Sequence, residues 1–289
     1  MRPLAKAAIP DALPSLAAAA SRMAGFRIVD VRDTDAFAAG HLPAAGQCTT
    51  AMFGERRMEL PSRLVPVVTV HDDPAQARAA ADRLALLGFE RIGWLDRALG
   101  DEPEGHASRE PATRLWSPSR FLEHVLPMLP RGRALDLACG SGRAAVHLAL
   151  AGFAVEAWDL DATALERADA FAARNGVRLA TRICDLESGP PALPEPRFDV
   201  VVVMRYLHRP LFPWLEQAIA PGGALVYETF RRGQEHFGHP RRDRHLLEPD
   251  ELRTAFPGLH VEIHEQDSPA TPPVMARLLA RKPWPPTER

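Results

Sequence analysis

The chain has 289 residues, of which 46% are hydrophobic and 25% are charged, and its formal net charge is −2. This composition is typical of a globular protein with room for one large domain or two ordinary ones, and it excludes a general electrostatic attraction to nucleic acid or anionic membranes. The three cysteines form no Cys-x-x-Cys pair, so a disulfide scaffold is disfavoured and we expect no metal site.

The amino terminus is rich in alanine but lacks the pattern of a targeting segment. Pro10, Asp11 and Pro14 interrupt its apolar run, and no stretch of the chain reaches the length of a membrane-spanning helix. We therefore expect a cytoplasmic protein without a membrane partner.

The first hundred residues alternate between strand and helix patterns. We predict helices at 15–24 and 75–87 and strands at 26–31, 65–70 and 91–95. Strands that alternate with helices indicate a small parallel sheet.

The same stretch resembles the rhodanese-like (sulfurtransferase) domain. Asp30-Val-Arg32, followed by Gly40-His-Leu-Pro-Ala-Ala45, matches the first signature of that family. The helix that ends at Leu86-Leu-Gly-Phe89, before Arg91-Ile-Gly-Trp-Leu95, matches its last quarter. The resemblance implies a small α/β domain over residues 1–100.

One position departs from the family pattern. In that family a cysteine follows the strand equivalent to 65–70 and carries sulfur as a persulfide in a loop of backbone N–H groups. Here His71 stands at that place, and an imidazole cannot form a persulfide. Asp72 and Asp73 would also repel a thiolate or an anionic sulfur donor. We therefore expect that sulfur transfer is lost, that Cys48 is buried packing, and that the domain has a structural or regulatory role.

A polar, proline-bearing segment over residues 101–114 is predicted to link this domain to a second one at 115–289. The second domain should begin with a helix capped by Ser117. We further predict helices at 144–150, 162–174, 211–220 and near 249–256, and strands at 133–137, 154–158, 177–183, 198–203, 224–230, 259–265 and 274–281. The loop at 189–196 is too rich in proline for a helix.

A glycine-rich turn joins the strand at 133–137 to its helix. Gly140 and Gly142 let this turn bend tightly and let a ligand approach the backbone. Asp136, Asp159 and Asp185 stand at the carboxyl ends of successive strands, where open α/β sheets bind nucleotides. The acid after the second strand can accept both ribose hydroxyls, and the acid after the third can accept the exocyclic amine of adenine.

Two cofactors compete for this pattern. Gly140-Ser-Gly142-Arg-Ala-Ala145 fits the dinucleotide fingerprint, which binds an anionic pyrophosphate on the turn. Asp136 would repel that anion, whereas it suits the sulfonium and ammonium groups of S-adenosylmethionine. The pattern thus favours S-adenosylmethionine and leaves an NAD-type oxidoreductase as an alternative.

The second domain resembles the class I S-adenosylmethionine-dependent methyltransferases, most nearly the small-molecule branch that includes tellurite-resistance and thiol-type enzymes. The residues that carry this resemblance are Leu135-Asp-Leu-Ala-Cys-Gly-Ser-Gly142, Asp159, Asp185-Leu186, Phe198-Asp-Val-Val and Pro221-Gly-Gly223. Ala138 stands where many members have their first glycine. The resemblance implies a Rossmann-like doubly wound sheet with strand order 3-2-1-4-5-7-6, its last strand antiparallel.

The resemblance also assigns residues to the cofactor. Those expected to contact S-adenosylmethionine are Asp136, Ala138, Cys139, Gly140, Gly142, Asp159, Leu160, Cys184, Asp185, Leu186 and Met204. Cys184 is expected to pack beside the adenine without redox chemistry. We assign Asp161 to the cap of the next helix and Asp199 to a structural role.

The methyl acceptor should face the end of the fourth strand, where Met204-Arg-Tyr-Leu-His-Arg209 follows. His208 could act as a general base, Tyr206 could orient the acceptor and Arg205 could hold an anionic group. Equally, Tyr206 and His208 could pack a lid over the cofactor. The Asn/Asp-Pro-Pro-Tyr/Phe motif of many amino-group methylases is missing, which disfavours a base amine as acceptor.

A basic insert follows the fifth strand. It contains Arg231, Arg232, Arg241, Arg242 and Arg244 with His236, His239 and His245. We favour a lid or a solvated loop over an RNA-facing patch, since no aromatic-interleaved motif accompanies it. The sequence thus predicts a methyltransferase that acts on a small molecule; a non-catalytic S-adenosylmethionine- or nucleotide-binding protein and an RNA methyltransferase are the alternatives, and a homodimer stays open.

Overall fold

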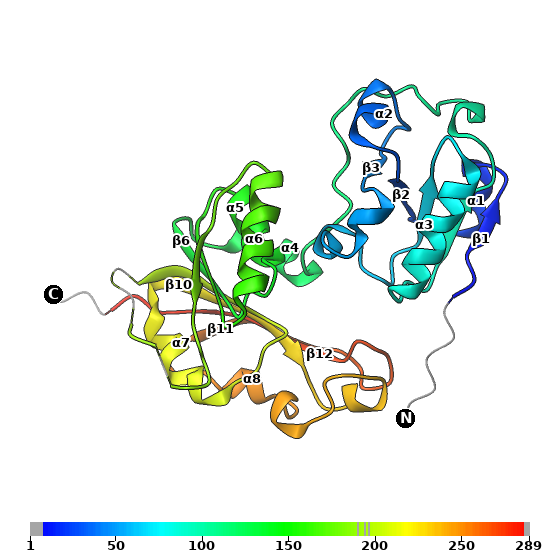
Figure 1. Cartoon of the computed structure of the whole chain (residues 1–289). Coiled ribbons are helices and arrows are strands. Elements are labelled where there is room, and N and C mark those ends of the chain that lie inside the picture. The colour runs from blue at the N-terminus through cyan, green and yellow to red at the C-terminus, as the bar shows by residue number, and fades with distance from the viewer. Residues whose placement is uncertain (1–7, 190, 194, 196, 286–289) are drawn as a thin grey trace. The chain divides into compact units, whose positions relative to one another are not determined.

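The computed structural model describes residues 8–189, 191–193, 195 and 197–285. The chain divides into two compact units, Met1–Ser117 and Pro118–Arg289, and Figure 1 shows a sheet with helices in each. Among the described residues, no helix has the length and apolar character needed to cross a bilayer.

The first unit contains a five-stranded sheet in the order β1-β5-β4-β2-β3, and every pair in it is parallel. Its strands are β1 (Asp11–Leu13), β2 (Arg27–Asp30), β3 (Gly46–Gln47), β4 (Val67–Val70) and β5 (Ile92–Leu95). Its α-helices are α1 (Leu16–Arg22), α2 (Thr34–Ala39) and α3 (Pro74–Leu86). The predicted small parallel sheet is present. The prediction lacked β1 and β3, which at three and two residues are too short for an alternating pattern to show.

The core of the first unit lies on both faces of this sheet. Val67 and Val70, the ends of β4, are fully buried and pack on opposite faces. Cys48 is 1% exposed and packs beside Phe53 and Leu84, so its predicted role in packing is confirmed.

The segment predicted as a linker is hydrogen-bonded to the first unit. His41 and Ser108 form a two-way backbone bridge, with N···O distances of 3.1 and 2.9 Å. The Thr113 N–H donates to the Ala45 carbonyl at 2.9 Å, and Leu115 is buried in the core of this unit. These contacts hold the segment in place, although its sequence shows no helix or strand pattern.

The second unit contains a seven-stranded sheet in the order β11-β12-β10-β9-β6-β7-β8. Its strands are β6 (Arg133–Leu137), β7 (Ala154–Asp159), β8 (Ala180–Ile183), β9 (Phe198–Met204), β10 (Ile219–Phe230), β11 (His260–Gln266) and β12 (Met275–Arg281). Numbered within the unit, this order is 3-2-1-4-5-7-6, and β12 runs antiparallel to both of its neighbours. The predicted Rossmann-like doubly wound topology is confirmed.

The α-helices of the second unit are α4 (Arg120–Val125), α5 (Arg143–Leu150), α6 (Ala162–Arg174), α7 (Phe212–Ala218) and α8 (Glu251–Thr254). The predicted cap of the first helix is wrong: Ser119, and not Ser117, caps α4, because its hydroxyl oxygen accepts hydrogen bonds from the Phe121 and Leu122 N–H groups. Asp161 caps α6 as predicted, with its carboxylate 2.9 Å from the Thr163 nitrogen. The described residues of the loop at 184–197 contain no helix, in line with their proline content.

Side chains from alternate positions of β9 fill two core layers. Val201 and Val203 pack on one face, with Trp158 and Trp214. Val200 and Val202 pack on the other face, in the same core layer as Phe153, which follows α5. A central strand of a parallel sheet is buried on both faces, and β9 has this property.

The two outermost strands of this sheet carry charged side chains. On β8, the Arg182 guanidinium lies 4.6 Å from the centre of the Trp158 ring. On β11, Glu262 pairs with Arg281 of β12. Polar and charged groups of this kind are common on strands that have no further neighbour.

Candidate functional site

The turn between β6 and α5 adopts an unusual backbone conformation. Ala138, Gly140 and Gly142 have φ values of 56°, 53° and 76°, in the left-handed region. A Cβ added at Gly142 would lie 2.7 Å from the Ala168 Cβ, whereas one added at Gly140 would meet nothing within 4 Å. Gly142 therefore allows close packing on α6, and Gly140 borders open space into which a ligand can approach.

The carboxylate of Asp159 is bonded to this turn. Its Oδ2 accepts the Gly140 N–H at 2.7 Å, and its Oδ1 accepts the Asp161 N–H at 2.9 Å. The carboxylate thus fixes the turn and is itself oriented by two backbone donors.

Asp136 is buried directly beneath the turn, with 1% of its surface exposed. Its Oδ2 accepts the N–H of Ala145, in the first turn of α5, at 2.8 Å, while its Oδ1 has no hydrogen-bond partner among the described residues. Burial raises the pKa of Asp136 to about 7; the Ala145 bond opposes this shift and the nearby charge of Asp159 adds to it.

These contacts decide which ligand charge the turn can accept. In a pyrophosphate site the amides of the turn and of the first helical turn point at the anion. Here one such amide, from Gly140, is bonded to Asp159, and another, from Ala145, is bonded to Asp136. An anion would have to displace a carboxylate, so the site suits a cation.

Apolar side chains are exposed beside the next two strand ends. Leu160 is 62% exposed and Ile183 is 63% exposed, and Ile183 lies opposite Asp159 in the β7–β8 register. Asp185 is exposed at the end of β8, and its Oδ1 accepts the Glu187 N–H at 2.9 Å. Exposed apolar side chains next to a carboxylate can hold a flat ring that carries an amine.

Two further predicted residues line the same edge from beneath. Leu186 is 5% exposed and Cys184 is 9% exposed, and both belong to the core layer of Trp158. Burial raises the pKa of the Cys184 thiol, which keeps it neutral and agrees with a packing role. Cys139 lies within the glycine turn, and its Sγ is 3.4 Å from the Gly140 oxygen.

The segment after β9 holds the residues predicted for the acceptor. Arg205 is exposed with a φ of 58°, and its N–H donates to the Glu228 carbonyl at 2.6 Å. His208 is half-buried just before the 3-10 helix Arg209–Leu211. The ring of Tyr206 packs on the core layer that contains Cys184 and Leu186, which lies on the predicted cofactor side. Met204, at the end of β9, packs on the opposite layer.

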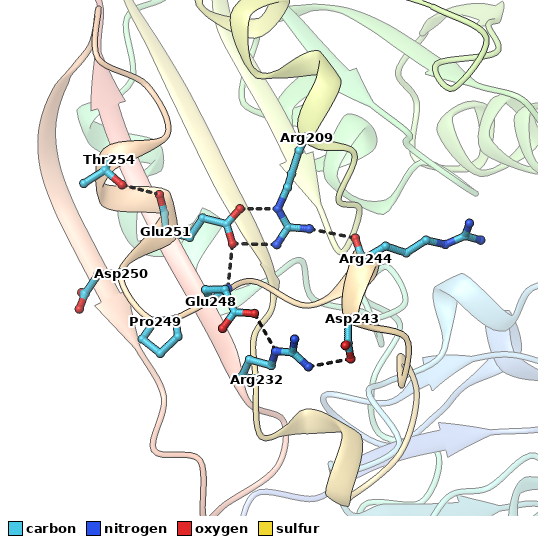
Figure 2. Close-up of a pocket in the computed structure, with 9 residues that line it drawn as sticks. All are labelled: Arg209, Arg232, Asp243, Arg244, Glu248, Pro249, Asp250, Glu251 and Thr254. Carbon is cyan, nitrogen blue, oxygen red and sulfur yellow. Dashed lines mark hydrogen bonds and ion pairs between the residues drawn. The ribbon is translucent and has the colours of Figure 1, made fainter.

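The basic insert forms a pocket of 740 Å³ whose walls carry both signs of charge (Figure 2). Its lining residues are Arg209, Arg232, Asp243, Arg244, Glu248, Pro249, Asp250, Glu251 and Thr254. Arg232 bonds to Asp243 at 2.7 Å and to Glu248 at 2.9 Å, and Arg231 donates to the Asp267 carbonyl at 2.7 Å. Two carboxylates therefore neutralise the charge of Arg232.

Arg209 connects this pocket to the acceptor segment. Its guanidinium bonds to both carboxylate oxygens of Glu251 and to the carbonyls of Arg244 and Leu246. Because Arg209 directly follows His208, these bonds connect the 244–251 stretch to the acceptor segment. The sequence alone gave no sign of this contact, since the two groups are about forty positions apart.

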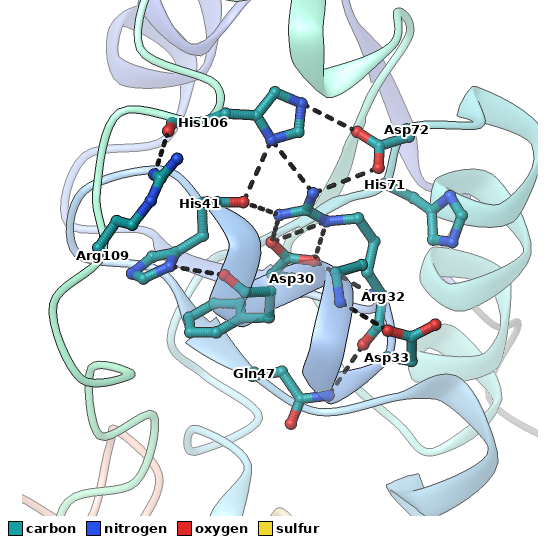
Figure 3. Close-up of polar contacts among 12 residues, drawn as sticks. Asp30, Arg32, Asp33, His41, Gln47, His71, Asp72, His106 and Arg109 are labelled. Atoms are coloured by element: carbon teal, nitrogen blue, oxygen red, sulfur yellow. Dashed lines mark hydrogen bonds and ion pairs between the residues drawn. The ribbon is translucent and has the colours of Figure 1, made fainter.

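In the first unit, the turn that follows β4 includes His71 and Asp72 (Figure 3), and two of its amides are bonded to nearby side chains. The helix α3 begins at Pro74, and the Asp73 carboxylate accepts the Ala75 N–H at 2.9 Å. The Nδ1 of His71 accepts the Asp73 N–H, also at 2.9 Å. The strand end is thus followed by a capped helix.

A buried arginine ties this turn to distant segments. Arg32 is 3% exposed, and its guanidinium bonds to Asp30 at 2.6 Å, to Asp72 at 3.2 Å and to the Gly40 carbonyl at 2.8 Å. His106, from the segment predicted as a linker, contacts both Arg32 and Asp72. His106 was missed because nothing in its local sequence indicates that it returns to this turn.

The described residues contain no group of three or more His, Cys, Asp or Glu side chains placed to hold a metal ion.

Comparison with known proteins assigns both units. Residues 134–223 match the family model of a methyltransferase domain, and residues 14–99 match that of a rhodanese-like domain. The chain is 38% identical over 99 residues to ribosomal protein L11 methyltransferase of Thermus thermophilus, which covers 34% of this chain and 38% of that protein. It is 28% identical over 171 residues to ubiquinone biosynthesis O-methyltransferase of a Caulobacter species, covering 50% of this chain and 65% of that protein. The chain thus spans less than two thirds of either relative.

Among solved structures, the second unit is similar to the N-methyltransferase NodS from Bradyrhizobium japonicum in complex with S-adenosyl-l-homocysteine. The TM-score is 0.46 and the identity is 19%, over 57% of this chain and 85% of that one. The two family matches and the strand order agree with the resemblances drawn from the sequence. The chain therefore contains a rhodanese-like domain over residues 14–99 and a methyltransferase domain over residues 134–223.

Proposed function

We propose that this chain is a methyltransferase that moves a methyl group from S-adenosylmethionine to a small molecule. The observation that carries the proposal is the pairing of the Gly140 and Ala145 amides with the carboxylates of Asp159 and Asp136. A turn arranged in this way repels a pyrophosphate and attracts a cation. The unpartnered Oδ1 of Asp136 and the open space beside Gly140 both fit such a ligand.

Each acidic residue then has one role. Asp159 would accept the two ribose hydroxyls, Asp185 the exocyclic amine of adenine, and Asp136 would balance the positive charge of the methionine end. Leu160 and Ile183, both exposed, would cover the adenine ring. The other turn and strand-end residues named from the sequence, Ala138, Cys139, Gly142, Cys184, Leu186 and Met204, would form the remaining walls.

When bound, the cofactor supplies an electrophilic methyl group. The protein has to align the acceptor with it and exclude water. His208 would take a proton from an acceptor that carries one, and Arg205 would hold an anionic group of the acceptor. Arg209 would keep this segment in place through Glu251.

Two features support a small acceptor. The residues after β9 lack the motif of amino-group methylases, and Arg232 of the basic insert is already paired with Asp243 and Glu248, which reduces the charge that RNA binding would need. A cytoplasmic location and a homodimer belong to the same proposal, and light scattering of the purified protein measures the second.

The test has two steps. Isothermal titration with S-adenosylhomocysteine and with NAD⁺ should show binding of the first alone; binding of NAD⁺ alone would favour an oxidoreductase. Cell extract is then incubated with the protein and labelled S-adenosylmethionine, and label is measured in the small-molecule, protein and RNA fractions. Label in the small-molecule fraction is expected. Label only in protein or RNA would contradict the acceptor class, and no label anywhere would favour a cofactor sensor.

We further propose that the rhodanese-like domain no longer transfers sulfur. His71 occupies the place of the sulfur-carrying cysteine, and the chain beyond it turns directly into the capped helix α3. The neighbouring Asp72 is bonded to Arg32. Cyanide-dependent thiocyanate formation from thiosulfate should therefore stay at the level of the uncatalysed reaction.

A further inference from the structure

At the end of β10 stands a carboxylate with one bonded and one open oxygen. Glu228 is 6% exposed, and its Oε2 accepts hydrogen bonds from the Ser119 hydroxyl at 3.0 Å and from the Arg277 Nε at 2.9 Å. Its Oε1 receives no hydrogen bond from any described residue, yet this oxygen is not closed off from solvent. A buried carboxylate that is only half satisfied costs stability, so its presence indicates a use.

The register of the sheet places Glu228 beside the segment predicted for the acceptor. It lies opposite Met204, the last residue of β9, and its carbonyl accepts the Arg205 N–H at 2.6 Å. Asp136 lies opposite Val202, two residues before Met204. Since side chains alternate along a strand, Asp136, Met204 and Glu228 face the same side of the sheet. Glu228 is thus two strand spacings, roughly 10 Å, across the sheet from Asp136, in the direction of the predicted acceptor.

The open oxygen of Glu228 is reached from the edge where the strands end. Val226, two residues earlier on β10, is fully buried on the same face, and its partner Leu279 on β12 is fully buried as well. Phe121 of α4 belongs to the same core layer. The space behind the carboxylate is therefore filled, and a ligand would approach it from the carboxyl edge of the sheet.

The neighbours of Glu228 leave its charge incompletely balanced. Arg277 donates one hydrogen bond to Glu228 but two to the carboxylate of Asp267, at 2.7 and 3.0 Å. Ser119 contributes only an uncharged hydroxyl. One guanidinium is thus shared between two carboxylates. A ligand group that carries a hydrogen and a positive charge is therefore favoured at Oε1, and an anionic group is disfavoured.

Methyl transfer to an amine creates a positive charge of this kind. An amine that has given its extra proton to solvent attacks with its lone pair: the nitrogen–carbon bond forms, the carbon–sulfur bond breaks, and the electron pair of that bond stays on sulfur. Positive charge moves to the nitrogen, and the new ammonium group later gives its proton to water. A carboxylate beside the nitrogen stabilises the transition state more than the neutral amine. It would repel a thiolate or an oxyanion.

We propose that Glu228 contacts the methyl acceptor and that the acceptor presents an aliphatic amino group to it. The inference rests on the proposed function and narrows its acceptor from small molecules in general to amines. An aliphatic amine differs from the base amine that the missing motif would serve, because its lone pair is not delocalised into a ring.

The experiment compares Glu228→Gln with Glu262→Gln as a matched control. Both substitutions remove the charge of a carboxylate that pairs with an arginine of β12, but Glu262 lies on the outer strand β11. Cell extract is incubated with the full chain and labelled S-adenosylmethionine, unreacted cofactor is removed on charcoal, and labelled small molecules are applied to a cation exchanger at pH 3. Isothermal titration with S-adenosylhomocysteine and thermal unfolding are measured on the same proteins.

We expect the cation exchanger to retain the labelled product of the parent. Glu228→Gln should form this product about 100-fold more slowly, because the developing charge loses its counterion. Its affinity for S-adenosylhomocysteine should not change, and its amide oxygen can still accept from Ser119 and Arg277, so its unfolding temperature should change little. Glu262→Gln should transfer label at the parent's rate.

A second variant covers the case in which Glu228→Gln does not fold. Glu228→Asp keeps the charge but draws it back by one methylene group, so it should be slower than the parent and faster than a folded Glu228→Gln. A rate for Glu228→Asp equal to that of the parent would contradict a contact at Oε1.

Three further results would overturn the inference. One is a labelled product that passes through the cation exchanger. Another is transfer at the parent's rate by Glu228→Gln. The third is a slower rate that comes with weaker binding of S-adenosylhomocysteine and a lower unfolding temperature, which would show that Glu228 only supports the fold. A parent protein that binds no S-adenosylhomocysteine and transfers no label would instead refute the proposed function itself.

Discussion

Both units contain a strand that ends in a turn and leads into a helix, and the two turns treat their polar groups in opposite ways. In the first unit α3 begins soon after β4, and the side chains of His71 and Asp73 accept the free amides of the turn. In the second unit the turn over residues 138–142 places Ala138, Gly140 and Gly142 in the left-handed region and leaves an oxygen of Asp136 buried and without a described partner.

This difference separates a turn that is complete by itself from one that a ligand would complete. In the first unit, the side chains of His71 and Asp73 accept two amides of the turn and Arg32 pairs with Asp72, so these groups are already engaged. In the second unit, the left-handed backbone of Ala138 and the unpartnered Oδ1 of Asp136 reduce stability and are retained where a ligand would use them. The contrast is open to direct tests at both turns.

The largest effect is expected from Asp159→Ala. This change removes the carboxylate that fixes Gly140 and would accept two ribose hydroxyls, so affinity for S-adenosylhomocysteine should fall about 100-fold. Isothermal titration measures the loss. Asp161→Ala is the control, because it removes only the α6 cap and should lower stability by about 1 kcal/mol without changing affinity. Equal affinity of parent and Asp159→Ala would remove the distinction between the two turns.

A smaller effect with a pH signature is expected from Asp136→Asn. The folded-state pKa of about 7 exceeds the ordinary 3.8, so this group costs the folded protein stability as pH rises from about 4 to about 7. The variant keeps an acceptor for Ala145 but has no charge to bury. Its unfolding temperature, measured against the parent by calorimetry, should therefore gain most above pH 7.

The same substitution sharpens the assignment of Asp136 to the cationic end of the cofactor. In the parent, affinity for S-adenosylhomocysteine should rise as the carboxyl ionises around pH 7, whereas in Asp136→Asn it should be about tenfold lower at pH 8 and nearly independent of pH. Parallel pH profiles for the two proteins would show that Asp136 only supports α5.

At the first turn we expect a substitution to lower stability, whereas Asp136→Asn at the second turn should raise it. Asp73→Ala removes the cap of α3 and should lower the free energy of unfolding of the first unit by about 1 kcal/mol. Urea unfolding followed by a probe in that unit measures the change. Affinity for S-adenosylhomocysteine should stay the same; a stabilised variant would mean that this turn, too, holds an unfavourable arrangement.

The smallest effect is expected from His71→Cys. The new thiol would sit beside Asp72 and Asp73, whose charges disfavour a thiolate, and the Ala75 amide would still be bonded to Asp73. Thiocyanate formation from thiosulfate and cyanide should stay at background. Vigorous sulfur transfer from this single substitution would contradict our interpretation of the turn.

Local signals in the sequence predicted those parts of the fold that local chemistry determines. The bounds of α6, Ala162–Arg174, were predicted because Asp161 supplies a cap at one end and Asn175-Gly176 a stop at the other. By contrast, the strand predicted at 224–230 is longer in the structure: β10 begins at Ile219, and its register with β9 shifts between Ile219 and Ala224. The Gly222 N–H donates to the Lys282 carbonyl and the Lys282 N–H donates to the Gly223 carbonyl, so backbone pairing with a distant segment extends the strand beyond what the local sequence predicts.

The same division holds for the candidate site. That acids would stand at the strand ends follows from the positions of the strands, and Asp136, Asp159 and Asp185 lie there. Contacts made across the fold could not be predicted. The bond of Asp159 to Gly140 and the paired bonds of Arg209 to Glu251 both depend on how distant segments pack.

The outer strands of the seven-stranded sheet have a consequence for handling the protein. Arg182 on β8 and Glu262 on β11 place charge where a strand from another molecule would have to pair. Such gatekeeping residues discourage the edge-to-edge growth that leads to fibrils. Concentrated solutions should accordingly resist this form of aggregation, and any self-association of the second unit should use its helices or loops instead of extending the sheet.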